Sequence, residues 1–248
     1  MKMVPIVTMP AHPTNTWDRY GAKIEYIVIH YVGAVSTAIN NGHYYGNTPK
    51  IGASAHYFVD QTTIVYSVPE NMSAGHCGVD YSHGKAPFWG KCRCKNSIGI
   101  EMCCKKDANG YWHIEPETIA NTIDLVKELM VKYNIPVEHV IRHYDVCYKI
   151  CPEPFVRDNS KWESFKLALL TVREDDDMER YNKISEMPGH YQAEAQKLVD
   201  RGALRGRTNG ALDVSEDMIR TLIIVQRMHD ADFEELKNDI AALKGKVG

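Results

Sequence analysis

The residue types best suited to chemistry are concentrated in the first 151 residues of the chain. His30 ends a short apolar run, and a single carboxylate, Glu101, interrupts another. His143, Lys149 and Cys151 follow within nine residues of one another. Nine of the eleven histidines fall at or before position 143, so we expect histidine chemistry in this part of the chain.

These residue types match the requirements of a catalytic zinc site. Such a site uses three protein ligands from His, Cys or carboxylate and leaves one position open. Two neutral imidazoles and one thiolate leave the ion a net charge near +1, so it still polarises a carbonyl and lowers the pKa of water. A nearby Glu can move a proton, and a Lys can stabilise an oxyanion. The set is suited to amide hydrolysis.

Each residue also has an ordinary interpretation when it is considered alone. A histidine at a strand end is usually structural, a cysteine beside a proline is usually a packed thiol, and a glutamate in a strand can face solvent. A thiol peptidase that uses Cys147 or Cys151 with His143 is a second chemical reading. Chelators separate the two, because a thiol enzyme survives them and is inactivated by iodoacetamide.

Several short motifs then occur in a fixed order along residues 23–155. They are Tyr26-Ile-Val-Ile-His-Tyr31, Ala53-Ser-Ala-His-Tyr-Phe-Val-Asp60, Ala74-Gly-His76, Asn96-Ser-Ile-Gly-Ile-Glu-Met102, Ile141-Arg-His-Tyr-Asp145 and Lys149-Ile-Cys-Pro152. In this order, and with eight residues from His143 to Cys151, they resemble the zinc-dependent N-acetylmuramoyl-L-alanine amidases of phage endolysins and bacterial autolysins. Peptidoglycan recognition proteins belong to the same family.

The resemblance implies a role for each matching residue. It implies that His30, His143 and Cys151 bind Zn²⁺ and that Glu101 is the catalytic carboxylate. It also implies that Lys149 is the catalytic basic residue two positions before the last ligand. It further implies that peptidoglycan is the substrate and that the bond cut joins N-acetylmuramic acid to the L-alanine of the stem peptide.

Two further histidines are expected to contact the substrate, and one family feature is missing. His76 and His56 are the candidate substrate-binding residues. Some members of the family carry a catalytic Tyr immediately before the His that matches His56, but this chain has Ala55 there. The proton-transfer role therefore falls to Glu101.

The remaining cysteines are predicted to be packed or exposed thiols. Cys77, Cys92 and Cys94 do not have the spacing of a structural zinc site. Cys103 and Cys104 are neighbours on a predicted strand, so their side chains point to opposite faces and cannot share a metal. An odd total of seven also argues against a full disulfide framework.

Composition excludes several classes of protein. The chain has 248 residues, 44% hydrophobic and 25% charged, which is typical of a globular protein, and its net charge of −3 argues against a nucleic-acid partner. No apolar run reaches the length of about 18 residues needed for membrane insertion. Residues 1–16 contain no apolar segment of a signal peptide. We therefore expect synthesis in a host cytoplasm and action on the cell wall.

Hydrophobic patterns predict an α/β fold with a mixed central sheet flanked by helices. Helices are predicted over 36–45, capped by Ser36 or Thr37, and over 116–133, with Pro116 at the first position. A long loop is predicted over 73–95, and another over 143–154. Strands are predicted over 23–31, 55–60, 64–68, 97–104 and 137–142.

The last third of the chain has a different pattern. Residues 1–172 are predicted to form the catalytic domain, 173–180 an acidic linker, and 181–248 a helical module with helices over 190–203 and 214–228. The module weakly resembles helical S-layer-homology units, so a cell-wall-binding role is expected. The stripe Phe233, Leu236, Ile240, Leu243 and Val247 has helical spacing and makes a homodimer through the C-terminal helices the alternative.

Together these features predict a peptidoglycan hydrolase, a phage or prophage endolysin. A muropeptide-recycling amidase is the near alternative, although a soluble substrate needs no wall anchor. A non-catalytic peptidoglycan-binding protein on the same fold is another alternative, but such proteins typically lack the thiol ligand that Cys151 provides here.

Overall fold

The computed structural model describes residues 4–77, 83–171, 179–207 and 210–244, with only the backbone for residue 233 and residues 235–244. The strands are β1 Ile6–Thr8, β2 Thr16–Asp18, β3 Tyr26–Val35, β4 Tyr57–Val59, β5 Ile64–Tyr66, β6 Met72–Ala74, β7 Ser97–Lys106, β8 Trp112–His113, β9 Val140–Arg142, β10 Arg180–Tyr181 and β11 Val214–Ser215. The α-helices are α1 Ala38–Asn47, α2 Pro116–Tyr133, α3 His143–Cys147, α4 Glu153–Arg157, α5 Asn159–Ala168, α6 Gly189–Asp200 and α7 Glu216–Lys244.

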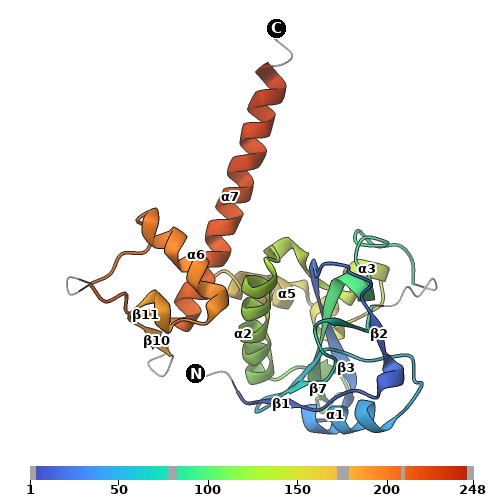
Figure 1. The fold of residues 1–248 in the computed structure, drawn as a ribbon. Coiled ribbons are helices and arrows are strands. Elements are labelled where there is room, and N and C mark those ends of the chain that lie inside the picture. Colours follow the sequence, from blue (N-terminus) through green and yellow to red (C-terminus); the bar gives the residue numbers. More distant parts are fainter. Residues whose placement is uncertain (1–3, 78–82, 172–178, 208–209, 245–248) are drawn as a thin grey trace.

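A seven-stranded mixed sheet forms the centre of the molecule (Figure 1). Its order is β1-β5-β4-β7-β3-β9, with β8 attached to β7. Strand β3 runs parallel to both β7 and β9, whereas β4 and β5 are antiparallel. Because β3 and β7 are buried on both faces, they consist of nearly continuous apolar runs rather than alternating ones. The predicted fold class, a mixed α/β sheet flanked by helices, is confirmed.

Helix α2 links the sheet to the C-terminal part of the chain. Pro116 stands at its start and Asn134, with a left-handed φ of 55°, ends it, as the sequence predicts. Two of its buried side chains, Val126 and Met130, share one apolar core with sheet residues and with residues of α6 and α7. The helix therefore has apolar neighbours on two sides, and the polar residue Lys127 is buried with them.

Several elements differ from the sequence predictions. The predicted loop over 73–95 begins inside β6, which pairs with β2. The predicted loop over 143–154 contains α3 and α4 instead. Helix α3 forms because the Asp145 carboxylate accepts a 2.8 Å hydrogen bond from the Arg142 backbone N–H and also pairs with the Arg142 guanidinium. Helix α5 and strands β1, β2 and β8 have no counterpart among the elements that the sequence predicts.

The C-terminal part packs against α2. Helix α6 begins one residue earlier than predicted, and α7 is a single helix from Glu216 that continues past the predicted end at Met228. Figure 1 shows α7 extending away from the rest of the molecule. Arg227 Nη1 of α7 donates to the backbone oxygens of Met130 and Val131 in α2, at 3.2 Å each. The sheet, α2 and the helices α6 and α7 thus share a core.

The division at 172 and 181 remains a prediction. Most of the acidic segment 173–180 lies outside the described residues, as does Val247. The side chains of Phe233, Leu236, Ile240 and Leu243 are also outside them, so the dimer through this stripe stays a prediction. None of the helices in the described parts of the chain is both long and apolar enough to cross a membrane.

A buried ion pair joins α2 to α7, and breaking it should destabilise the protein. Lys127 Nζ lies 2.7 Å from Asp217 Oδ1, and both side chains are at most 2% exposed. Asp217→Ala would leave the ammonium buried without its carboxylate, so we expect the free energy of unfolding to fall by about 3–5 kcal/mol. Urea denaturation measures this loss.

The exposed pair between Arg201 and Asp230 provides the control. Its atoms are 2.8 Å apart, but both side chains are about half exposed, so Asp230→Ala should change stability little. Equal, small effects of the two substitutions would show that the contact between α2 and α7 contributes little to folding.

A candidate metal centre in a large cleft

Three neighbouring strands bring the candidate ligands together. His30 lies in the middle of β3, opposite Glu101 of β7 in the strand register. Strand β9 pairs with the other side of β3 and ends at Arg142, so His143 follows directly at the start of α3. The chain then turns back, and a 2.9 Å hydrogen bond from Tyr144 N to the backbone oxygen of Cys151 places this cysteine beside His143.

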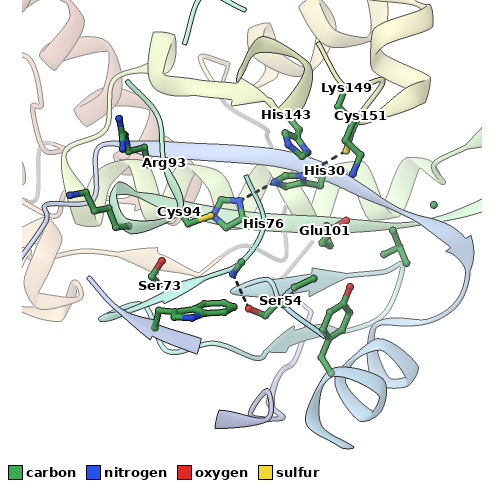
Figure 2. Close-up of a pocket in the computed structure, with 18 of the residues that line it drawn as sticks. His30, Ser54, Ser73, His76, Arg93, Cys94, Glu101, His143, Lys149 and Cys151 are labelled. Carbon is green, nitrogen blue, oxygen red and sulfur yellow. Dashed lines mark hydrogen bonds between the residues drawn. The ribbon is translucent and has the colours of Figure 1, made fainter. Parts of the chain in front are cut away.

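The donor atoms of His30, His143 and Cys151 converge (Figure 2). One donor atom from each residue lies within 4.8 Å of the other two. Cys151 Sγ is 3.6 Å from His30 Nδ1, and the two imidazole centroids are 4.7 Å apart. All three residues are at most 4% exposed. The structure therefore assembles the three residues that the sequence singled out.

The chemistry of these donors fits a Zn²⁺ ion. Burial lowers the pKa of His30 well below its usual value, and the neighbouring His143, His76 and Lys149 lower it further. The ring is then neutral, which is the form that binds a metal. Burial raises the pKa of the Cys151 thiol, with Glu101 acting in the same direction. Loss of the thiol proton at neutral pH would need a cation beside the sulfur, which a metal ion supplies.

Glu101 and Lys149 complete the wall around the cluster. Glu101 Oε2 is inaccessible to solvent and has no hydrogen-bond partner among the described residues. Burial raises the pKa of Glu101 to about 8, while the positive charge of Lys149 acts in the opposite direction. Lys149 is exposed and lines the same cleft. A carboxyl group whose pKa is near neutrality can both accept and release a proton.

The cluster lies in a cleft of about 910 Å³. Three aromatic side chains that were not predicted as site residues also line the cleft. They are Trp17 of β2, Tyr20 in the turn after β2, and Tyr45 of α1. Burial raises the pKa of Tyr45 to about 12, and the charge of Glu101 contributes to the shift. Tyr45 therefore keeps its phenolic proton. Trp17 lies in β2, which was not predicted, and Tyr45 lies in a predicted helix whose position beside the cleft no local pattern shows.

The two candidate substrate-binding histidines occupy different positions. His76 is 8% exposed and lines the cleft next to His30. His56 is fully buried and is not among the cleft residues. Its Nδ1 accepts a 2.9 Å hydrogen bond from Gly99 N, and its Nε2 lies 3.2 Å from the Met72 backbone oxygen. His56 thus makes contacts within the sheet rather than at the cleft, and its expected contact with substrate stays a prediction that these contacts do not favour.

The other cysteines are reduced and mostly packed in the core. Cys103 and Cys104 belong to different apolar clusters, as expected for neighbours on a strand. Cys77, Cys92 and Cys94 lie together in a third cluster, and the sulfurs of Cys77 and Cys94 are 3.8 Å apart. Among the described residues, the only grouping of three or more candidate ligands is that of His30, His143 and Cys151.

Comparison with known proteins gives this arrangement a family. The family model described as N-acetylmuramoyl-L-alanine amidase matches residues 20–154, more than half of the chain. The chain therefore belongs to the N-acetylmuramoyl-L-alanine amidase family.

Individual members of the family can be compared with it. This chain is 34% identical over 160 residues to the amidase CwlL of Bacillus licheniformis, and the match covers 61% of this chain and 43% of that protein. It is 33% identical over 165 residues to the amidase BlyA of Bacillus subtilis, covering 62% and 44%. The chain thus spans less than half the length of these relatives.

Solved structures support the fold assignment. A mutant endolysin from Bacillus subtilis matches with a TM-score of 0.53 and 28% identity, covering 67% of this chain and 99% of that one. The catalytic domain of XlyA matches with a TM-score of 0.52 and 26% identity, with the same coverage. These neighbours correspond to about two thirds of this chain.

Proposed function

We propose that this protein is a zinc-dependent peptidoglycan hydrolase that cuts the amide between N-acetylmuramic acid and L-alanine. The observation that carries the proposal is the convergence of two imidazoles and one thiol beside a carboxyl group with a raised pKa, all in one large cleft. Family membership supports the choice of bond.

The ligands would be His30, His143 and Cys151. When bound, a Zn²⁺ ion supplies a Lewis acid that polarises the scissile carbonyl and lowers the pKa of water. The three side chains are held by the packed β3, β9 and the turn after α3, so little reorganisation is needed on binding.

Two further residues would handle protons and charge. Glu101 takes a proton from the attacking water and passes it to the amide nitrogen that leaves with L-alanine. Glu101 lines the cleft, and its Oε2 has no hydrogen-bond partner among the described residues that would compete for the proton. Lys149, which lines the same cleft, stabilises the negative charge that develops on the carbonyl oxygen.

The experiment that tests this function combines metal analysis with mass spectrometry of digested cell walls. We expect one zinc per chain and stem peptides that begin with a free L-alanine amine, with the glycan strands intact. New reducing sugar ends would indicate a glycosidase, and new amines inside the stem peptide would indicate a peptidase. Either result would contradict the proposal.

A chelator experiment separates the proposal from a thiol peptidase. Phenanthroline should abolish hydrolysis, and added zinc should restore it. The raised pKa of Cys151 disfavours the free thiolate that a cysteine nucleophile requires. Activity that survives phenanthroline would favour the thiol enzyme.

Lys149 allows a separate test of oxyanion stabilisation. Lys149→Ala should retain zinc but lower kcat/KM by about 10²-fold or more, the usual cost of removing one such contact. The exposed Lys23 is a matched control, since it lies outside the cleft, and Lys23→Ala should leave the rate unchanged. The two variants are compared on a soluble muropeptide. Equal rates would remove Lys149 from the mechanism.

We also propose that residues 181–248 bind the cell wall, as expected of a phage or prophage endolysin. Sedimentation with purified walls tests this, with full-length Glu101→Gln used so that the walls stay intact. A chain that ends at residue 171 is the comparison. Because the shared core with α2 would be exposed in that chain, its folding must be checked first by circular dichroism. Equal sedimentation of two folded proteins would remove the wall-binding role.

A further inference from the structure

A chain of hydrogen bonds leads away from the metal cluster into the sheet. His30 Nε2 lies 3.0 Å from His76 Nδ1, and His76 Nε2 lies 3.1 Å from Ser97 Oγ. Ser97 Oγ in turn lies 2.7 Å from the backbone oxygen of Arg93. Figure 2 shows His76 and Cys151 on opposite sides of the His30 ring.

The direction of every bond follows from the last one. The Arg93 carbonyl can only accept, so Ser97 must donate its single hydroxyl proton to it. Ser97 Oγ must then accept from His76 Nε2–H. A neutral imidazole has one N–H, so His76 Nδ1 is an acceptor and His30 Nε2 must carry the proton that binds it. The sulfur of Cys77, 3.5 Å from Ser97 Oγ, can donate to the remaining lone pair.

This sequence of bonds fixes the tautomer of His30. With its proton on Nε2, the ring presents the lone pair of Nδ1, and Nδ1 is the atom 3.6 Å from Cys151 Sγ. The opposite tautomer would point an N–H at the ligand cluster and could not bind a cation. Metal-binding histidines generally need such an outer partner to set the tautomer and the ring orientation.

The position of His76 is itself fixed by β7. A Cβ atom added to Gly99 would lie 2.4 Å from Cγ of the His76 ring, so the ring packs directly on the backbone of this glycine. The ring is buried and both of its nitrogens are engaged. It cannot rotate toward a ligand without breaking both hydrogen bonds.

We infer that His76 is a positioning residue that, together with Ser97, holds His30 in the tautomer that binds zinc through Nδ1. The inference rests on the zinc site proposed above. It replaces the expected role of His76 as a contact for the substrate.

Zinc affinity and His30 tautomer are the two measurements that test this role. His76→Leu removes the acceptor, whereas the Oδ1 atom of His76→Asn can stand near the position of Nδ1. We expect His76→Leu to bind zinc about 10–100-fold more weakly, measured by competition with a chromophoric chelator, and His76→Asn to recover most of the affinity. His43→Leu, an exposed histidine of α1 outside the cleft, is the control.

The tautomer is read from the metal-free protein labelled with ¹⁵N-histidine. Long-range ¹H–¹⁵N correlations should show the His30 proton on Nε2 in the wild type and a loss of this preference in His76→Leu. If His76→Leu does not fold, the wild-type spectrum still tests the His30 tautomer. Ser97→Ala removes the acceptor of the His76 Nε2 proton, so it should change the tautomer preference of His76 in the same spectrum. A proton on Nδ1 of His30 in the wild type would overturn the inference, as would unchanged zinc affinity in His76→Leu. A wild type that binds no zinc would instead overturn the proposed function.

Discussion

A His143→Ala protein is expected to lose both its bound zinc and its ability to lyse cell walls. His143 supplies one of the three donors that lie within 4.8 Å of one another, and two donors do not make a stable open site. Without the metal, the reaction loses its Lewis acid, so hydrolysis should fall to background. Metal analysis of the purified protein and turbidity loss of a wall suspension measure the two effects.

Two comparisons make this result specific. His43→Ala removes an exposed histidine outside the cleft and should retain one zinc and full activity. Cys151→Asp should keep part of the activity, because a carboxylate is also a zinc ligand. A His143→Ala protein that still holds one zinc and lyses walls would refute the ligand assignment.

Glu101→Gln should separate metal binding from catalysis. The amide has nearly the shape of the carboxyl group but cannot move a proton, so we expect a full complement of zinc and a rate on soluble muropeptides lower by about 10²–10⁴-fold. Glu101 lines the cleft, and no hydrogen-bond partner among the described residues holds its Oε2.

Glu117 is the matched control for this substitution. It is exposed in the first turn of α2, and Glu117→Gln should leave the rate unchanged. Near-normal turnover of Glu101→Gln with zinc bound would place proton transfer on another group, and Tyr45, whose phenol lies in the same cleft, would be the next to examine.

The metal cluster could be predicted from the sequence because its residue types and motifs are visible without the fold, although His30 lies within β3 and only His143 directly follows a strand. His30 lies in a run buried on both faces, and such runs mark the central strands of a sheet. The step from His143 to Cys151 is local, so it is visible in the sequence even though α3 was not predicted. The strand register that sets Glu101 beside His30 comes from long-range pairing, which no local pattern shows, so only the resemblance assigned Glu101 to the site.

The roles of His56 and His76 could not be predicted in the same way. Both histidines sit in motifs, but their roles depend on which partner each ring nitrogen meets. Those partners, Gly99, Ser97 and the Met72 carbonyl, come from other strands. The packing of α7 on α2 was also missed, because an amphipathic helix shows that it has an apolar face but not which element covers it.

The sharing of a core between α2 and the C-terminal helices has a consequence for protein engineering. The proposed cutting and wall-binding roles make the connecting acidic segment the obvious place to exchange one part for another. Here an exchange at residue 173 would strip cover from α2 and leave the Lys127 ammonium without its acidic partner. A working chimera would have to redesign the outward face of α2 or carry α6 and the first half of α7 with the sheet. The useful junction therefore lies along α7, well beyond the charged segment that the sequence marks as the boundary.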